Sequence, residues 1–168
     1  MALNYILRNF VVFVDGFGKV GDGAECKLPK IAEKVDDFLG GGMYRPIEIP
    51  LVGEKLEASF KLTSFDPQVI GKAGLAIGQE KSFVFRGSLA SKDGTTIGVI
   101  ARMLAGIKDA DFGTWKVGEK SEIEFQLRVD RYTLTHGDTE LIHIDCLNFI
   151  ERRNGVNQLD ADRIALGL

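Results

Sequence analysis

The sequence predicts a mainly β protein, an antiparallel β-sandwich or barrel with one short flanking α-helix. Three observations lead to this prediction. In several segments apolar and polar residues alternate with a period of two, which is the pattern of a strand with one buried face. Pairs of these segments are joined by turns that contain glycine and aspartate, which suit antiparallel hairpins. One segment of the body combines a helix start signal with apolar residues at helical spacing.

The chain begins with a predicted strand from Tyr5 to Val14, which ends at the turn residues Asp15-Gly16. A glycine-rich loop follows. Residues 31–39 alternate poorly, but we predict an extended strand there rather than a short helix.

Residues 40–53 are predicted to project from the sheet. Gly40-Gly41-Gly42 forms a flexible joint, because glycine restricts the backbone least. Pro46 and Pro50 cannot donate to a sheet ladder, so the segment is confined to a sheet edge or a projection.

The middle of the chain contains a clear strand, a helix and a hairpin. Leu56 to Leu62 alternates well. Asp66-Pro67 then starts the helix, with Asp as its N-cap and Pro in its first turn. Its apolar positions are Val69, Ile70, Ala73 and Ile77, and glycines at 71, 74 and 78 keep it short. Strands at 83–89 and 95–104 surround the turn Asp93-Gly94.

The longest predicted hairpin spans Glu122 to Ile150. The apolar face of its first strand carries Ile123, Phe125, Leu127 and Val129, and the polar face carries Glu124, Gln126, Arg128 and Asp130. The turn is His136-Gly137-Asp138, and the return strand runs from Leu141 to Ile150 with Ile142, Ile144 and Cys146 in one phase. The alternation breaks at Arg131-Tyr132, which predicts a bulge.

The remaining segments are a polar loop and a tail. The loop at 108–120 holds Trp115, which we interpret as a packing anchor within the subunit or at an interface. The tail, residues 151–168, shows weak helical periodicity from Leu159 to Leu166.

Length and composition indicate one folded domain, residues 1–168, with the projecting loop 40–53. Hydrophobic residues make up 45% and charged residues 27%, and the net charge of −3 does not indicate nucleic-acid binding by bulk charge. Apolar runs are too short to cross a bilayer, and the N-terminus lacks a signal-peptide layout. We therefore expect a protein made in the cytoplasm. Cys26 and Cys146 are too few for a metal cluster, and we expect both to be buried.

Three motifs resemble ligand sites but lack the required context. Residues 16–21 match the G-x-G-x-x-G dinucleotide fingerprint, and Asp36 lies where a ribose-binding acid would be expected, but further glycines and Pro29 leave no room for the helix. His136 and His143 lie near Asp138 and Asp145 without an evident third metal ligand. A calcium loop that began at Asp109 would place Lys120 where glutamate is required. We therefore predict no catalytic residues, no metal and no cofactor.

The sequence instead indicates a protein that acts through its strand surfaces. Long two-faced hairpins leave sheet edges, and identical subunits can pair such edges in a ring. The competing class is an enzyme or small-ligand-binding β-barrel, with the histidine pair or the glycine loop as its site.

Seven short motifs in order along the chain resemble the major tail tube protein family of contractile phage tails and R-type pyocin tubes. They are Phe13-Val14-Asp15-Gly16, Lys27-Leu28-Pro29-Lys30, Gly41-Gly42-Met43, Phe85-Arg86-Gly87-Ser88, the run from Asp111 to Lys120, Asn154-Gly155-Val156 and Leu166-Gly167-Leu168. The resemblance covers nearly the whole chain. The glycine-rich segment Gly71 to Gly74 departs from the family pattern, which puts the length of the helix in doubt.

The resemblance implies a structural protein rather than an enzyme. Homo-hexameric rings would stack into the inner tube of a contractile tail or phage-tail-like particle, with neighbouring subunits joining their sheets around a lumen. The implied partners are a sheath protein outside, baseplate and tail terminator proteins at the ends, and DNA or a tape-measure protein in the lumen, with no membrane insertion. The alternative within this architecture is the tube of a contractile secretion or injection system.

Two sets of residues are candidates for contacts in such an assembly. The projecting loop carries Met43, Tyr44, Ile47, Ile49 and Leu51, which are too apolar for a loop that stays in water and are predicted to form inter-subunit or inter-ring contacts. The polar face of the long hairpin, Glu124, Gln126, Arg128 and Asp130, is predicted to face the lumen. A solvated outer face is the alternative for the second set.

Overall fold

The computed structural model describes residues 4–74 and 76–168. Within these residues the chain forms twelve strands and two short helices. Their bounds are β1 (Ile6–Val14), β2 (Phe17–Gly18), β3 (Gly23–Lys27), β4 (Glu33–Phe38), β5 (Ile47–Gly53), β6 (Leu56–Leu62), α1 (Pro67–Ile70), β7 (Lys81–Ala90), β8 (Thr96–Asp111), β9 (Ile123–His136), β10 (Thr139–Asp145), β11 (Ile150–Arg153), β12 (Val156–Asn157) and α2 (Asp160–Leu166). The mainly β, antiparallel fold predicted from the sequence is confirmed.

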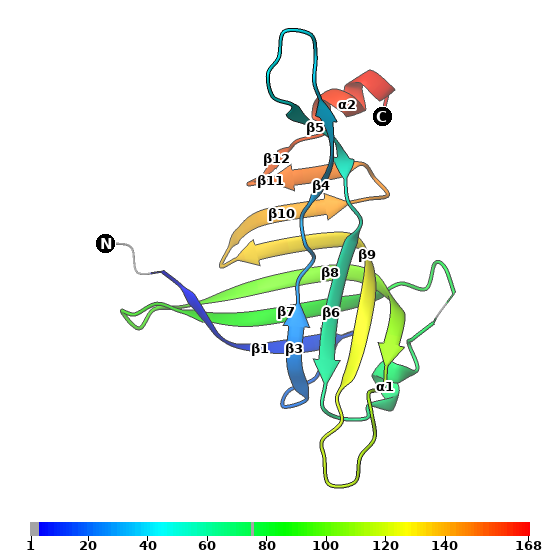
Figure 1. Cartoon of the computed structure of the whole chain (residues 1–168). Helices are drawn as coiled ribbons and strands as arrows, with labels where there is room; N and C mark the ends of the chain where they lie inside the picture. The colour runs from blue at the N-terminus through cyan, green and yellow to red at the C-terminus, as the bar shows by residue number, and fades with distance from the viewer. Residues whose placement is uncertain (1–3, 75) are drawn as a thin grey trace.

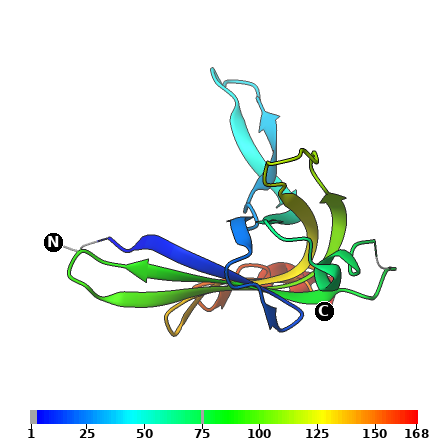
Figure 2. The same ribbon diagram turned by 90° about the horizontal axis from the view of Figure 1, so that it is seen from below.

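The strands form two layers and a projection. The main layer has the order β12-β11-β10-β9-β8-β7-β1-β2. The second layer consists of β3 and β6, and it is continuous with the main layer because β6 pairs with the first half of β9. Figure 2 shows the second layer rising from one side of the main layer, which we call the core side; the other is the far side. Strands β4 and β5 form a separate two-stranded sheet that projects from the body.

A bulge in β9 allows this strand to serve both layers. Leu104 pairs with Arg131 and the next residue of β8, Ala105, pairs with Val129, so Asp130 is left as the extra residue. An extra residue bends a strand and shifts its alternation by one. Tyr132 therefore points to the same side as Val129, and both are buried. The bulge predicted near Arg131-Tyr132 is confirmed.

The hydrophobic core fills the angle between the two layers. The apolar face predicted for the first strand of the long hairpin is buried throughout, and it meets the alternating apolar residues of β6. Phe60 of β6 stacks on Phe125 of β9 at 5.0 Å between ring centroids and meets Phe85 edge-on at 6.0 Å. Full burial stabilises each such side chain by roughly 1.5–3 kcal/mol.

The predicted helix is only one turn long. Asp66 caps α1 by accepting a hydrogen bond from the backbone N–H of Gln68 at 2.9 Å, as expected. The helix ends at Ile70 because Gly71 follows as its C-cap and Gly74 takes a positive φ of 71°. Ile77, predicted on its apolar face, is 90% exposed, so that part of the prediction is wrong.

Two further expectations are corrected near the C-terminus. The return strand β10 ends at Asp145, because residues 146–149 form a turn and pairing resumes in β11. Cys146 lies in this turn and is exposed, and Cys26 is only partly buried, so the expected burial of both thiols is wrong. The weak helical periodicity of the tail corresponds to α2, which ends at Gly167 in the left-handed conformation.

Candidate assembly surfaces

The projecting hairpin is the largest apolar feature outside the core. We call β4, β5 and the loop between them the hairpin, residues 33–53. Its exposed side chains include every residue predicted as a contact, with Tyr44 at the tip 94% exposed. The exposed apolar members are Val35, Phe38, Leu39, Met43, Tyr44, Ile47, Ile49, Leu51 and Val52. Apolar side chains gathered on an exposed element of this kind mark an interaction site.

The two faces of the hairpin differ in polarity. Phe38 pairs with Ile47 and Asp36 pairs with Ile49, so these four side chains share one mainly apolar face. The opposite face carries two further carboxylates, on Asp37 and Glu48, which pair with each other. Pro50 lies opposite Val35 at the base of this two-stranded unit, where β5 has no further strand partner.

The main layer leaves one long edge open. Strand β1 pairs with β7 along most of its length, but β2 covers its other side only at Phe13 and Val14. Among the strands that the structure describes, none pairs with the outer edge of residues 6–11. Ile6 and Leu7 on this edge are 69% and 53% exposed. An edge of this kind is ready to pair with another chain.

The opposite edge of the main layer is formed by β11 and β12. Strand β12 pairs with β11 at Arg152 and Arg153, and the backbone N–H and C=O groups of Glu151 are bonded to Asn157 and Gln158, so the outer side of the short strand β12 forms this edge. The molecule therefore presents two different edges at the two ends of the same layer, residues 6–11 of β1 and the outer side of β12 (Figure 1). Two different edges on one subunit can make a head-to-tail contact that repeats from copy to copy.

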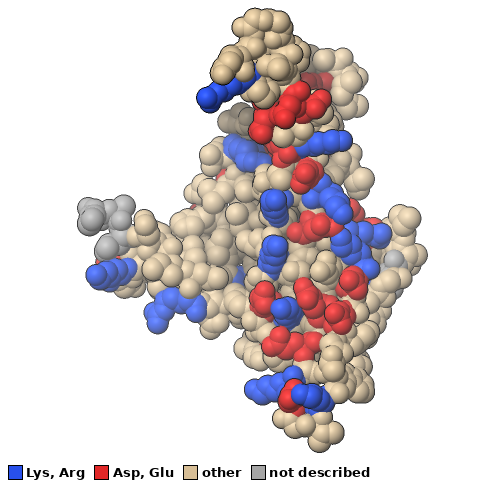
Figure 3. Space-filling model, viewed as in Figure 1, with Lys and Arg blue, Asp and Glu red and all other residues tan. Residues whose placement is uncertain are grey.

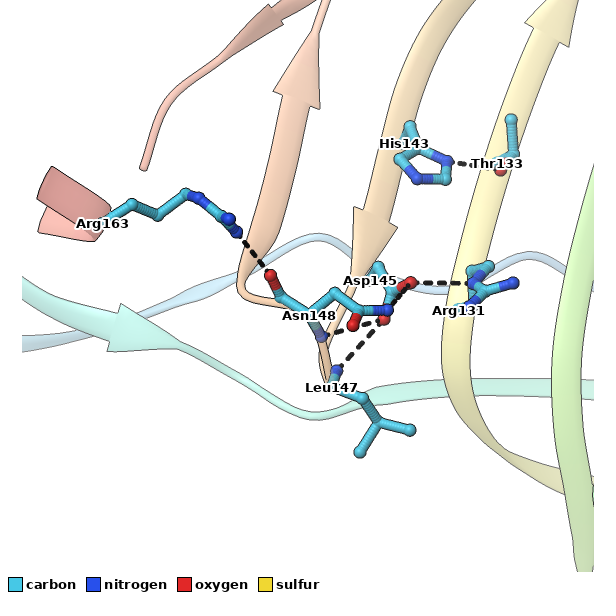
Figure 4. Close-up of polar contacts among 7 residues, drawn as sticks. All are labelled: Arg131, Thr133, His143, Asp145, Leu147, Asn148 and Arg163. Atoms are coloured by element: carbon cyan, nitrogen blue, oxygen red, sulfur yellow. Dashed lines mark hydrogen bonds and ion pairs between the residues drawn. The ribbon is translucent and has the colours of Figure 1, made fainter. Parts of the chain in front are cut away.

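A buried carboxylate organises the chain at this second edge (Figure 4). Asp145 accepts hydrogen bonds from Arg131 Nε at 2.9 Å and from Asn148 Nδ2 at 2.7 Å. It also accepts from the backbone N–H groups of Leu147 and Asn148 at 3.2 Å. Arg163 of α2 donates to the Asn148 carbonyl at 2.6 Å, which ties the terminal helix to the same turn.

The balance of these contacts lowers the pKa of the Asp145 carboxyl. Burial acts to raise the pKa, but the hydrogen bonds from Asn148 and Arg131 outweigh it. The carboxylate is therefore held in its charged form, and it fixes the turn from which β11 departs.

The polar face predicted for the long hairpin lies on the outer side of the second layer. Glu124, Gln126 and Arg128 lie opposite Lys61, Ser59 and Glu57 of β6. Asp130 does not continue this row, because it is the unpaired residue of the bulge. Figure 3 shows charged groups of both signs gathered along this side of the molecule.

Ion pairs link many of these charges. Glu57 contacts both Lys55 and Lys108, and hydrogen bonds from Lys108 and Lys55 lower the pKa of the Glu57 carboxyl to about 2. Lys61 pairs with Glu25 at 3.0 Å. Exposed pairs of this kind contribute little to stability, so this surface is best described as a hydrated face of mixed charge.

The far side of the main layer carries a set of arginines that the sequence analysis did not identify. Strand pairing places Arg86, Arg102, Arg131 and Arg152 on this side, one from each of β7, β8, β9 and β11. Arg131 and Arg152 pair with Asp145 and Glu140, and the Arg86 guanidinium lies 5.3 Å from the ring centroid of Phe13. The alternation in β7 and β8 would have identified Arg86 and Arg102. Arg152 could not be identified in this way, because β11 was not predicted as a separate strand.

The motifs examined as ligand sites have other structural roles. His136 meets the Tyr5 ring, whereas His143 contacts the Thr133 hydroxyl at 2.8 Å on the opposite side of the layer. The glycine motif forms the turn between β1 and β2, with Gly16 at a φ of 86°. Within the described residues, no group of three or more His, Cys, Asp or Glu side chains is arranged to hold a metal ion. In the same residues, no helix is long and apolar enough to cross a bilayer.

Trp115 lies in an exposed aromatic cluster. It meets the Phe65 ring edge-on at 6.3 Å, and Phe65 in turn lies 6.2 Å from Phe112. Because Trp115 is still 73% exposed, its packing within the subunit is partial. The interpretation of Trp115 as an anchor at an interface stays a prediction.

Comparison with known proteins shows the family of this chain. The family model of phage tail tube protein FII matches residues 4–167. The chain is 31% identical to the tail tube protein of Escherichia phage P2 over 172 aligned positions, which cover all of both chains. It is 35% identical to the major tail tube protein of Serratia phage KSP20, covering all of this chain and 99% of the relative. The protein therefore belongs to the phage tail tube protein FII family.

Solved structures share the fold at low sequence identity. The sheath/tube terminator of the extracellular contractile injection system PVC matches with a TM-score of 0.59 and 14% identity, over 80% of this chain and 99% of the terminator. The tube-terminating cap of the anti-feeding prophage matches with a TM-score of 0.59 and 15% identity, over 80% and 94% of the two chains. The fold of this tail tube protein is thus shared with proteins of contractile injection systems.

Proposed function

We propose that this tail tube protein assembles into hexameric rings that stack to form the inner tube of a contractile tail. The observation that carries the proposal is the pair of different edges at opposite ends of the main layer. Joining the β1 edge of one copy to the β11–β12 edge of the next leaves neither edge exposed once the ring closes. The role is structural and uses no catalytic residue or cofactor.

The partners follow from the position of a tube in such a particle. A sheath protein would surround it, baseplate and terminator proteins would cap its ends, and DNA or a tape-measure protein would occupy its lumen. Two structural relatives support this proposal, because one belongs to the sheath-tube complex of the PVC injection system and the other to the baseplate of the anti-feeding prophage. The working location is the virion, or a phage-tail-like particle, after synthesis in the host cytoplasm.

The hairpin supports a second part of the proposal. We include Met43, Tyr44, Ile47, Ile49 and Leu51 among the contacts between subunits or rings. All five side chains are exposed in the single subunit, and the hairpin extends beyond β11 and β12 of the main layer.

The side of the sheet that lines the lumen has two candidate assignments. The sequence prediction assigns Glu124, Gln126, Arg128 and Asp130 to the lumen. The fold favours the far side of the main layer, because the second layer and the hairpin both stand on the core side. A ring closed with the core side inward would have to fit both of them inside its channel.

Imaging tests the proposal directly. Purified protein, followed over a wide concentration range by size-exclusion chromatography with light scattering and negative-stain microscopy, is expected to form rings and, at high concentration, tubes. A protein that stays monomeric throughout the range, with no rings on the grids, contradicts the proposal.

A further inference from the structure

One part of the main layer has an apolar side that its own subunit leaves uncovered. The arm, residues 6–11 and 86–100, contains the first half of β1, the end of β7 and the start of β8. Figures 1 and 2 show it extending beyond the second layer. Cross-strand pairing places Leu7, Leu89 and Ile97 on the same side.

This side continues the core side of the sheet. In β7 it follows in phase from the buried residues Phe83 and Phe85, but on the arm Leu89 and Ile97 are only half-buried and belong to no core cluster. Gly87 lies between them, and the side chains of Leu7 and Val99 converge above it. The arm therefore presents an aliphatic surface, the arm face, to solvent.

The order of strands predicts what lies beside the arm in a ring. Strands β11 and β12 are at one end of the main layer, and β1 is at the other end. If the sheets join edge to edge, the strands just beyond β12 of one copy are β1, β7 and β8 of the next copy. The arm of the next copy is thus the neighbour of this edge.

The hairpin of the first copy extends in the same direction. Figure 1 shows it projecting past β11 and β12. It joins β3 to β6, the two strands of the second layer, and Figure 2 shows it on the core side of the main layer. It therefore projects on the side of the sheet on which the next copy exposes its arm face.

The two surfaces are complementary in polarity and charge. The hairpin contains four carboxylates, from Glu33, Asp36, Asp37 and Glu48, and two basic groups, from Lys34 and Arg45. Apart from Arg86, which points to the far side, the arm contains two basic residues, Arg8 and Lys92, and one acidic residue, Asp93, which already accepts a hydrogen bond from the backbone of Thr95. Both surfaces also expose aliphatic side chains, and this combination favours association with the correct orientation.

We propose that the hairpin of each subunit docks onto the arm face of the next subunit in the same ring. The occupant of the arm face is therefore a second copy of this chain. The contact buries Ile47 and Ile49 against Leu89 and Ile97. This inference rests on the proposed ring assembly and adds to it the partner surface of the hairpin.

Cross-linking tests the contact in assembled tubes. A chain with Cys26→Ser, Cys146→Ser, Ile47→Cys and Ile97→Cys is assembled and treated with a short bismaleimide. Docking within a ring links each subunit to the next, so a denaturing gel shows a ladder that stops at the hexamer. The matched control replaces Ile97→Cys by Ile77→Cys, an exposed position outside the arm, and is expected to give no ladder.

The outcomes separate this inference from the proposed function. Tubes with the closed ladder support the contact. Tubes without a ladder, or with a ladder that runs past the hexamer, overturn the intra-ring contact and leave the tube function intact. Absence of rings in every variant, including the chain with only the two serine substitutions, contradicts the proposed function itself.

A charge substitution provides a second, independent readout. The pair Ile47→Glu and Ile49→Glu is expected to abolish rings while the circular dichroism spectrum of the monomer is retained, because these side chains lie outside the core. The control Ile77→Glu is expected to assemble normally. Normal rings from the double variant contradict the docking.

Discussion

At the residue scale, the buried carboxylate of Asp145 illustrates how one side chain sets the course of a sheet edge. Its hydrogen bonds reach β9, the turn at 146–149 and, through Asn148, the helix α2. Its side chain is 6% exposed, so water cannot replace these partners easily. The position of β11, and with it one of the two joining edges, depends on this group.

Asp145→Asn is expected to destabilise the fold by about 1.5–3 kcal/mol at pH 7, the usual range for hydrogen bonds to a charged group. The folded pKa of Asp145 is lowered, so its stabilisation is present above the unfolded pKa of about 3.9 and is lost as pH falls through the folded value. The difference in urea unfolding between the wild type and the variant should therefore be largest at pH 7 and should shrink as the pH falls below about 3.9 toward the folded pKa. Asp138→Asn, at an exposed turn position, is the control.

Gly113 is a position where the backbone requires glycine. Its φ is 68°, and a Cβ there would lie 2.8 Å from the carbonyl oxygen of Glu122. Gly113→Ala is expected to lower the free energy of unfolding by about 1–2 kcal/mol or more, because left-handed strain adds to the clash. Gly98→Ala, where a Cβ meets nothing within 4 Å, should change it far less. Equal losses in denaturant unfolding of the two variants would contradict this account.

At the element scale, the hairpin is a two-stranded unit that draws little stability from the body. It forms a sheet of its own, and its large apolar side chains are exposed on both strands. An isolated two-stranded hairpin is only marginally stable in water. We therefore expect the hairpin to gain most of its stability from contacts with other subunits in the assembled tube.

Deletion of residues 44–51 is expected to abolish tubes while the rest of the subunit stays folded. The deleted residues contribute nothing to the hydrophobic core, so the thermal unfolding midpoint should change little. Microscopy and thermal unfolding of the same preparation check both halves of this prediction. Normal tubes from the deletion variant would show that the hairpin is dispensable.

Prediction from sequence succeeded where one physical signal dominated an element. The alternation in β6 and in the first half of β9 reflects burial on one side, and the structure reproduces it residue by residue. The helix was predicted too long because the glycines at 71 and 74 outweigh the spacing of the apolar residues. Cys146 continued the phase of β10, but Asp145 ends that strand by capping the following turn. Such a tertiary contact leaves no periodic signal.

Of the two candidate contact surfaces, the hairpin was predicted from the sequence and the arm face was not. The apolar residues of the hairpin were identified because glycine and proline exclude them from a central strand. The arm face was missed because Leu89, Ile97 and Val99 look like ordinary core residues in the sequence. Only the extent of the second layer decides which part of an apolar strand face its own subunit covers.

At the scale of the whole molecule, the two sides of the main layer differ. The second layer and the hairpin both stand on the core side, and the far side carries neither of them. The far side carries the four arginines, and the outer side of the second layer carries the mixed charges around Gln126. In the proposed tube, one of these two surfaces would face the lumen and the other would face outward.

Cysteine labelling distinguishes the two assignments of the lumen. On a background without Cys26 and Cys146, Arg102→Cys and Gln126→Cys are reacted with a maleimide too bulky to enter the channel. The fold favours protection of position 102 in tubes and unchanged labelling of position 126, with both labelled in free subunits. The reverse pattern would establish the sequence prediction that Glu124, Gln126 and Arg128 face the lumen.

Strand β9 runs without interruption over 14 residues from the part that pairs with β6 into the main layer, and the 16-residue strand β8 pairs with it along both parts. A pull applied to the second layer along β9 is carried into the main layer by covalent bonds rather than by side-chain packing alone. Along the strand direction, the ladder between β8 and β9 is loaded in shear, so many hydrogen bonds resist together instead of opening one at a time. These two strands therefore couple the second layer mechanically to the main layer.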